Sequence, residues 1–407
     1  MFRPAKTAKS TGFLSFLLVF ATAAMLAGCG SSSGSHSSPA ASGWHLLPEA
    51  PSAIAAGRTS VWTGTEMIIS GTNPGADGTF IRSVEVAEAY NPATREWRKL
   101  ASPPKTESFC HRDAVWTGKE MLVWGCDFVA FNPKANEWRR LPVPLTREGI
   151  VVWTGRELIG WGGGCCGDAD SDGSAYNPAT NTWRKLARSP LAPSQSPTGA
   201  WTGKELIMFV SGLDPEGKPV KGAARAAAYN PATDTWRRIA PLPTPDQGTN
   251  AVWDGQEILV AATGLAYNPT TDRSRAMAPI ASGRRTQALA VWTGRQLLLW
   301  GGEQARPEGL AYDPQADRWS PLPKSPLVER LDPAGVWTGR ELIVWGGVIG
   351  TPVGTSIPAK YLADGAAFRP NDTGDRSTAA ARARPTSRTR PRQLIAQRPS
   401  TPLPACC

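Results

Sequence analysis

The feature that most constrains the fold is a segment that recurs seven times along the 407-residue chain. Each copy holds Trp-Thr-Gly, once Trp-Asp-Gly, followed by a run of apolar residues. The tryptophans are Trp62, Trp116, Trp153, Trp201, Trp253, Trp292 and Trp337, with a mean interval of about 46 residues. Two β-rich runs joined by Thr-Gly, as in AVWTGKEMLVWG, indicate a β-hairpin. The repetition predicts similar β-sheet units that stack on one another.

A second motif follows the first in every copy, and consists of alanine, an aromatic residue, a third residue and proline. The aromatic residues are Tyr90, Phe131, Tyr176, Tyr229, Tyr267, Tyr312 and Phe368. In five copies a tryptophan stands seven residues later, at Trp97, Trp138, Trp183, Trp236 and Trp319. Asn and Pro at the first two positions favour a type I turn. That turn places Tyr176 across from Trp183 on one sheet face, where aromatic pairs stabilise.

Paired glycines end the apolar run in several copies, as in Trp161-Gly162-Gly163 and Trp300-Gly301-Gly302. Double glycine, a variable gap, then Tyr and Trp at this separation resembles the Kelch repeat, over residues 43–370. The resemblance implies a β-propeller of four-stranded antiparallel blades, similar to the central domain of galactose oxidase. We therefore expect an all-β protein with one domain over residues 43–371, a seven-bladed Kelch-type β-propeller.

The seventh copy lacks its outer tryptophan, because Asp375 stands seven residues after Phe368. The stretch GWHLLP, which begins at Gly43, contains Trp44 and has no repeat unit upstream. We predict that this N-terminal strand completes the seventh blade and closes the ring. Closure leaves no unpaired sheet edge that would favour aggregation.

The first residues resemble a bacterial export signal, with basic residues, an apolar run over residues 13–26, and then small residues. That run is shorter than the roughly 20 residues of a membrane-spanning helix. Leu26-Ala27-Gly28-Cys29 resembles the lipobox of bacterial lipoproteins. The resemblance implies removal of residues 1–28, acylation of Cys29 and a membrane anchor in the bacterial cell envelope. Ordinary secretion with an incidental thiol is the alternative.

The Ser-rich residues 29–42 predict a flexible tether. Residues 372–407 are rich in Arg, Pro, Ser, Thr and Ala and predict a disordered basic tail; a shifted reading frame is the alternative. The formal charge of +10 comes from the two ends, since residues 30–375 have a net charge of zero. We therefore expect no nucleic-acid partner.

Two sets of links join the strands of such blades, and they lie on opposite faces of the disc. The links after the first and third strands are nearly invariant, whereas the other links vary freely. Function is carried disproportionately by variable loops on a rigid scaffold, so we expect it on that face. Arginines at the starts of several first strands are candidates for a collar that binds a carboxylate or sulfate: Arg58, Arg112, Arg147, Arg285 and Arg330. Pairing with loop acids such as Glu148 and Asp332 is the alternative.

Asp168, Asp170 and Asp172 alternate before Gly173, as acids do in calcium loops. The twelfth position is Ala179, so the bidentate Glu of an EF-hand is absent, and an acidic surface loop is the alternative. Cys110 and Cys126 flank the second unit's hairpin and predict a disulfide. Cys165 and Cys166 form a strained bridge or stay reduced. We expect no zinc site and no cofactor other than a possible Ca²⁺.

The sequence favours a binding protein over an enzyme. The copper site of galactose oxidase needs histidines and tyrosines, whereas this chain has three His and, outside the repeat positions, only Tyr361. His111 beside Ser108 is a candidate for nucleophilic chemistry. Paired carboxylates for glycoside chemistry stay open as well, among loop acids such as Asp168, Asp170, Asp214 and Glu216. We expect a monomeric, membrane-anchored propeller that binds a protein or glycan. The alternative is a carbohydrate-active enzyme resembling Kelch-type sialic acid epimerases, whose arginines would hold an acidic sugar.

Overall fold

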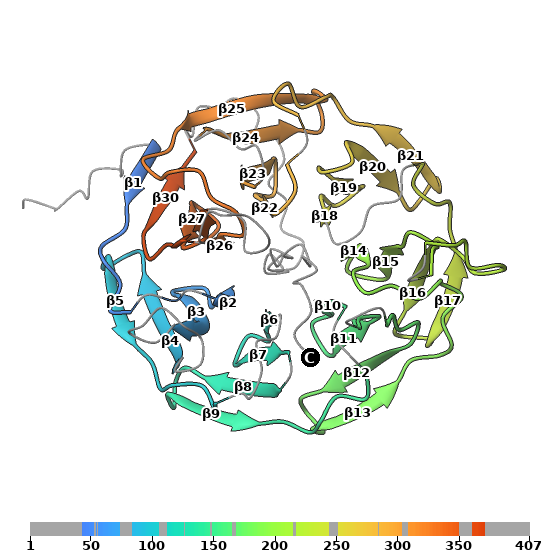
Figure 1. Ribbon diagram of the computed structural model, residues 1–407, viewed down its shortest axis with the longest axis horizontal. Helices are drawn as coiled ribbons and strands as arrows, with labels where there is room; N and C mark the ends of the chain where they lie inside the picture. Colours follow the sequence, from blue (N-terminus) through green and yellow to red (C-terminus); the bar gives the residue numbers. More distant parts are fainter. Residues whose placement is uncertain are drawn as a thin grey trace, which may run out of the picture. The chain divides into compact units, whose positions relative to one another are not determined.

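The computed structural model describes residues 43–52, 54, 56–73, 84–105, 112–125, 127–146, 149–164, 168–214, 217–243, 251–283, 285–302, 308–349 and 360–370. All regular secondary structure in these ranges is β. It forms seven four-stranded antiparallel sheets around one axis (Figure 1) and one additional two-stranded ribbon. The fold is a seven-bladed β-propeller, as the repeat predicts. Among these residues there is no helix long and apolar enough to cross a membrane.

Each of the first six blades is formed by four consecutive strands. Blade 1 has β2 (Ala56–Trp62), β3 (Met67–Asn73), β4 (Val84–Asn91) and β5 (Glu96–Lys99). Blade 2 has β6 (Asp113–Trp116), β7 (Met121–Trp124), β8 (Phe128–Asn132) and β9 (Glu137–Arg140). Blade 3 has β10 (Ile150–Trp153), β11 (Leu158–Trp161), β12 (Gly173–Asn177) and β13 (Thr182–Lys185).

The next three blades repeat this order. Blade 4 has β14 (Thr198–Trp201), β15 (Leu206–Phe209), β16 (Ala226–Asn230) and β17 (Thr235–Arg238). Blade 5 has β18 (Ala251–Trp253), β19 (Ile258–Val260), β20 (Leu265–Asn268) and β21 (Arg273–Ala276). Blade 6 has β22 (Ala288–Trp292), β23 (Leu297–Gly301), β24 (Glu308–Asp313) and β25 (Arg318–Lys324).

Blade 7 closes the ring with strands from both ends of the propeller. It contains β26 (Ala334–Trp337), β27 (Leu342–Trp345), β30 (Gly365–Arg369) and, outermost, β1 (Gly43–Leu46). Trp44 lies opposite Phe368, with ring centroids 5.2 Å apart. A short ribbon of β28 (Val348–Ile349) and β29 (Lys360–Tyr361) stands on the link between β27 and β30. The predicted N-terminal closure is confirmed.

The repeated turns have a local chemical cause. In the Thr-Gly turn, the Thr154 hydroxyl accepts a hydrogen bond from the Glu157 amide at 2.9 Å, and Gly155 adopts a φ of 94° that other residues avoid. In the Asn-Pro turn, the Asn177 side chain accepts a bond from the Ala179 amide at 2.9 Å. The resulting register places Tyr176 opposite Trp183, as predicted, with ring centroids 5.2 Å apart.

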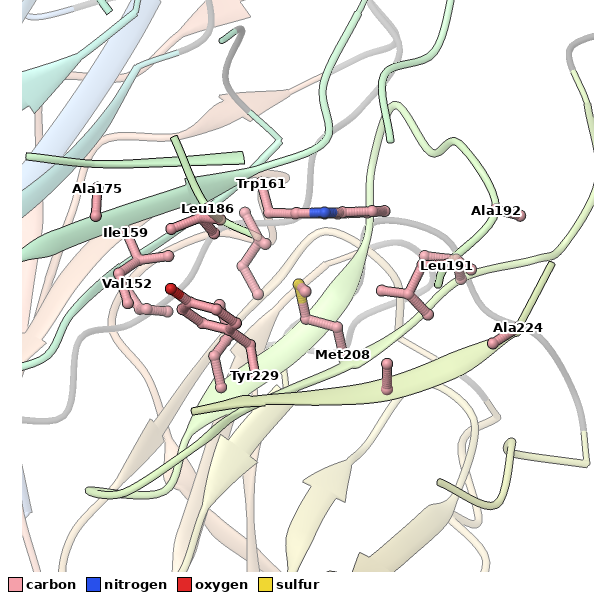
Figure 2. Close-up of a cluster of buried hydrophobic side chains, with 14 residues drawn as sticks. Val152, Ile159, Trp161, Ala175, Leu186, Leu191, Ala192, Met208, Ala224 and Tyr229 are labelled. Atoms are coloured by element: carbon pink, nitrogen blue, oxygen red, sulfur yellow. The ribbon is translucent and has the colours of Figure 1, made fainter. Parts of the chain in front are cut away.

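The blades are held together by buried apolar side chains between neighbouring sheets. Figure 2 shows the cluster between blades 3 and 4, where Trp161 and Leu186 of one blade meet Met208 and Tyr229 of the next. The first strands of neighbouring blades contact each other around the whole ring, β26 with β2 included. Figure 1 shows these first strands nearest the axis and the fourth strands outside. Burial between sheets therefore supplies the propeller's core.

The outer tryptophans add a hydrogen bond across each interface they occupy. Each indole N–H donates to a backbone carbonyl at the end of the preceding blade. The pairs are Trp44 to Pro323, Trp97 to Pro48, Trp138 to Ala101, Trp183 to Pro142, Trp236 to Ala187 and Trp319 to Ala278, at 2.7–3.0 Å. Trp44 follows the rule of the other five, so the closing strand is equivalent to the outer strands. Blade 5 has Ser274 at this position.

Candidate functional site

The two faces of the disc are defined by their links. The turn face consists of the links after the first and third strands of each blade, such as 63–66 and 92–95. The loop face consists of the links after the second strands and those between blades. Loop-face links after the second strands differ in length, from 125–127 in blade 2 to 346–364 in blade 7, whereas turn-face links are uniformly short. The loop face is thus the part of the disc that differs from blade to blade.

Two candidate arginines on the loop face lie in ion pairs. Arg330 donates to the Asp364 carboxylate at 2.6 Å and to the Gly346 carbonyl at 3.1 Å, and its guanidinium lies 5.8 Å from the centroid of the Trp300 ring. Arg112 makes a bidentate pair with Glu85 of blade 1 at 2.6 and 2.7 Å. Both arginines are buried. Each pair joins a link between blades to a neighbouring segment, and charge-assisted bonds of this kind are strong.

Two further candidate arginines are buried and donate to backbone carbonyls, and one of them, Arg58, also forms a longer ion pair. Arg58 donates to the Asp332 carbonyl at 2.9 Å, and its guanidinium lies 3.9 Å from the Asp332 carboxylate. Arg285 donates to the Glu308 carbonyl at 3.1 Å. The fifth candidate, Arg147, lies outside the described residues. An acidic ligand would compete with these intramolecular bonds, and its binding by the five arginines stays a prediction.

Backbone groups of the acidic loop of blade 3 take part in hydrogen bonds to neighbouring segments. The Asp170 amide donates to Gly163 at 2.9 Å, and the Gln195 side chain donates to the Asp168 carbonyl at 2.6 Å. No three His, Cys, Asp or Glu side chains come together in a metal-binding arrangement anywhere in the described part of the chain, Asp168, Asp170 and Asp172 included. Calcium binding here stays a prediction from the sequence pattern.

Several predicted sites lie outside the described residues: Cys29, Cys110, Cys126, Cys165, Cys166, Ser108 and His111. The described histidine, His45, lies in β1 opposite Ala367. Tyr361 lies in β29, and burial raises the pKa of its hydroxyl, with Arg58 as the opposing charge. A phenol in this state donates hydrogen bonds and does not act as a base near neutral pH.

A small recess lies between the innermost strands at the hub. Thr59, Ser60 and Asp113 are the polar residues of its lining, and the Ser60 hydroxyl donates to the carbonyl of Gly335 in its wall at 3.3 Å. Such groups can hydrogen-bond a polar ligand. General acid–base chemistry needs groups tuned to give and take a proton, and Asp113 is the one titratable residue among the described residues that line the recess.

Exposed apolar side chains gather on the loop face. Of the large apolar residues exposed in the described chain, Leu46 belongs to an outer strand. The others lie in loop-face links or at a strand end on that face: Val84, Val143, Leu145, Leu213, Val328 and Ile349. Val143, for example, is 84% exposed. Interaction surfaces are marked by contiguous apolar patches rather than by singly exposed residues, and these six residues come from the links and strand ends of several blades.

The turn face carries a ladder of ion pairs that the sequence analysis missed. A glutamate four residues after the first-strand tryptophan accepts hydrogen bonds from an arginine of the same blade. The pairs are Glu66–Arg98, Glu120–Arg139, Glu157–Arg184, Glu205–Arg237, Glu257–Arg275 and Glu341–Arg369, at 2.6–3.3 Å. The fixed spacing Trp-x-x-x-Glu in six of the seven copies is the signal that could have revealed them.

Tyrosines and αL residues form a second repeated network on this face. The Tyr229 hydroxyl donates to Asp234 at 2.6 Å, and Asp234 also accepts from the Ala187 amide of blade 3 at 3.0 Å. Burial and the Asp317 carboxylate raise the pKa of Tyr312 to about 12 in the equivalent pair of blade 6. These bonds join neighbouring blades, so the repetition of the same turns from blade to blade has a structural explanation.

No protein-family model matches this chain, and no curated protein matches it. The propeller fold is therefore established by strand order and register, and the function must be argued from the two faces.

Proposed function

We propose that the chain is a Kelch-type propeller, exported to the bacterial cell envelope and anchored by a lipid on Cys29, which binds a protein or glycan through its loop face. The observation that carries the proposal is the concentration of exposed apolar side chains on that face, including Val143, Leu213 and Val328. Interfaces combine such apolar contacts with a polar rim. The turn face instead uses its repeated groups in internal bonds.

The closed ring also supports a monomer. Its seventh sheet is completed within the chain by β1, so ring closure needs no second copy. The arginine and calcium predictions specify what a ligand could use on the loop face. A carboxylated sugar would meet arginines of the collar: Arg58, Arg112, Arg147, Arg285 and Arg330. Ca²⁺ would be held by Asp168, Asp170 and Asp172.

The test is an array of glycans and envelope proteins probed with residues 30–407, which keep every strand of the ring. A hit is then measured with Val143→Asp, Leu213→Asp and Val328→Asp combined, because these exposed positions tolerate polar residues without loss of fold. We expect affinity to fall at least about tenfold, as for substitutions at a binding hot spot. Unchanged affinity would contradict loop-face binding. Turnover of the hit would indicate the enzymatic alternative.

Arg112→Ala and Arg285→Ala test the collar, provided that stability is measured alongside. Loss of Arg112 leaves Glu85 buried without its bidentate partner, which costs about 3–5 kcal/mol. A variant that stays folded and binds an acidic hit unchanged would exclude its arginine from the site.

A further inference from the structure

The turn face carries an inner circle of exposed cations. Each hairpin between a first and a second strand has a tip of four residues, and the third is a cation in five blades: Lys119, Arg156, Lys204, Arg295 and Arg340. The other two blades have Thr65 and Gln256 there. All seven positions are exposed. Because the first strands surround the axis (Figure 1), the five cations surround the hub on one side of the disc.

None of these five cations forms an ion pair within the described chain, although Glu205 is close enough to feel the charge of Lys204. The backbone amide of each cation donates to the threonine hydroxyl of its own hairpin, as Lys204 does to Thr202 at 3.3 Å. The glutamates next to them in the hairpins form ion pairs with arginines of the same blade, as Glu205 does with Arg237 at 2.8 Å. The inner circle therefore presents unneutralised positive charge.

The outer part of the turn face carries charges of both signs. The turns between third and fourth strands combine exposed cations with exposed acids, such as Arg95 with Glu96 and Lys134 with Glu137. No large apolar residue is exposed in the turn-face links of the described chain. Such a face suits attraction to charged headgroups at a surface, without apolar insertion.

Both ends of the propeller leave from this same face. Gly43, the first residue of β1, pairs with Arg369, the last residue of β30, and β30 runs toward the turn face. The sequence before Gly43 contains the proposed anchor at Cys29, and the sequence after residue 375 carries seven arginines and no acid. A short tether to a membrane would thus bring the turn face, not the loop face, toward it.

We infer that the turn face docks on an anionic phospholipid surface through the cation circle, and so directs the loop face away from the membrane. The orientation rests on the proposed lipid anchor at Cys29. The affinity of the circle for anionic lipid does not depend on that anchor. Basic groups near an anionic bilayer are attracted within about one Debye length, so docking is salt-sensitive.

The test measures partitioning of residues 30–407, which lack Cys29, onto phosphatidylcholine vesicles with and without phosphatidylglycerol. Lys119→Gln, Arg156→Gln, Lys204→Gln, Arg295→Gln and Arg340→Gln are combined in one variant. The matched control combines Lys105→Gln, Arg188→Gln, Lys218→Gln, Lys221→Gln and Lys324→Gln, which are exposed cations of the loop-face side. Both variants change the net charge equally, and unfolding curves check that both stay folded.

We expect the turn-face variant to lose on the order of a thousandfold in partitioning onto phosphatidylglycerol vesicles, since each of the five cations near such a surface contributes about fivefold. The control should stay within a few-fold of the unmodified protein, and residues 30–371 should show the same dependence without the arginine-rich tail. The inference would be overturned if the unmodified protein did not bind, or if the two variants lost binding equally. It would also be overturned if binding disappeared when the tail was removed. Circle-dependent binding to a soluble polyanion without vesicle binding would overturn it too.

The outcome is separable from the proposed function. Ligand affinity of the loop face is measured in solution without vesicles, and acylation of Cys29 is read from the mass of the mature protein. Either can fail while the vesicle result stands, and the reverse also holds.

Discussion

The turn face and the loop face are made by the same seven sheets, yet their exposed side chains differ in kind. On the turn face, links of one length repeat the same ion pairs and the same tyrosine bonds from blade to blade. On the loop face, links vary in length, and apolar groups such as Val143 and Val328 are exposed. Repetition marks the side whose residues stabilise the ring, and variation marks the side that is free to specify a ligand.

The largest expected effect comes from removing the strand on which both faces depend. Deletion of residues 43–48 takes away β1, the Trp44 contact with Phe368 and the Trp97 bond to Pro48. We expect the free energy of unfolding to fall by more than about 4 kcal/mol, because an apolar sheet edge and an interface are exposed. Urea unfolding measures this. A protein that begins at residue 43 is the control, and equal stability of the two would contradict closure by β1.

A second test compares the stability effect of a packed aromatic residue with that of an exposed loop-face residue. Trp183 contacts Trp124, Phe128 and Tyr176 with centroids 4.9–5.2 Å apart and donates to Pro142. Trp183→Ala should therefore destabilise by about 3–5 kcal/mol. Val143→Ala, on the loop face, should change stability by less than about 0.5 kcal/mol. Similar losses in thermal or urea unfolding would remove the distinction between the two regions.

A smaller effect isolates the tyrosine network of the turn face. Burial acts to raise the pKa of Asp234, but hydrogen bonds from Tyr229 and the Ala187 amide, with Arg184 nearby, bring it below its usual range. Its ionised form thus stabilises the fold above the unfolded pKa near 4, and this contribution is lost as pH falls through the folded pKa. Tyr229→Phe should cost about 1 kcal/mol at neutral pH.

The pH dependence of that variant provides the control. Because Tyr229→Phe removes a donor to the carboxylate, its stability should fall less than that of the parent between pH 5 and pH 3. Unfolding curves with parallel pH dependence would contradict the assigned role of the hydroxyl.

An effect of similar size but opposite sign concerns an acid buried where the ring closes. Glu88 of β4 is 1% exposed, and burial raises its pKa, offset in part by Ser52 and Lys99. A raised carboxyl pKa means that the fold is favoured by protonation, fully below the unfolded value near 4.3, and loses this contribution as pH rises through the folded pKa. Glu88→Gln should therefore stabilise by about 1 kcal/mol at pH 7.5 and by nothing near pH 4. A destabilised variant at pH 7.5 would show that the charge is compensated.

Local chemistry made the fold predictable from the sequence. Thr-Gly and Asn-Pro fix their own turns, a spacing of seven fixes the Tyr176–Trp183 register, and the missing tryptophan after Phe368 points to Trp44. These inferences need only neighbouring residues or one unfilled position in a repeat. The same logic marks blade 5, where Ser274 replaces the outer tryptophan.

The surroundings of the candidate site were less predictable, because they depend on how different blades face each other. Arg112 is paired with Glu85 of the preceding blade, and Arg330 with Asp364, the last residue of the variable link of blade 7. Neither partner can be chosen from sequence spacing. Burial of an arginine depends on the same packing. The sequence therefore does not distinguish an arginine that binds a ligand from one that pairs with a neighbouring loop.

The division between the faces is tested most directly by hydrogen–deuterium exchange of residues 30–407, free and saturated with a ligand found on the array. Peptides from the loop-face links 142–146 and 217–225 should exchange more slowly in the complex, while the hairpin tips 154–157 and 202–205 should not change. Slower exchange at those tips with unchanged loop-face links would show that the ligand binds the turn face, and would contradict the account.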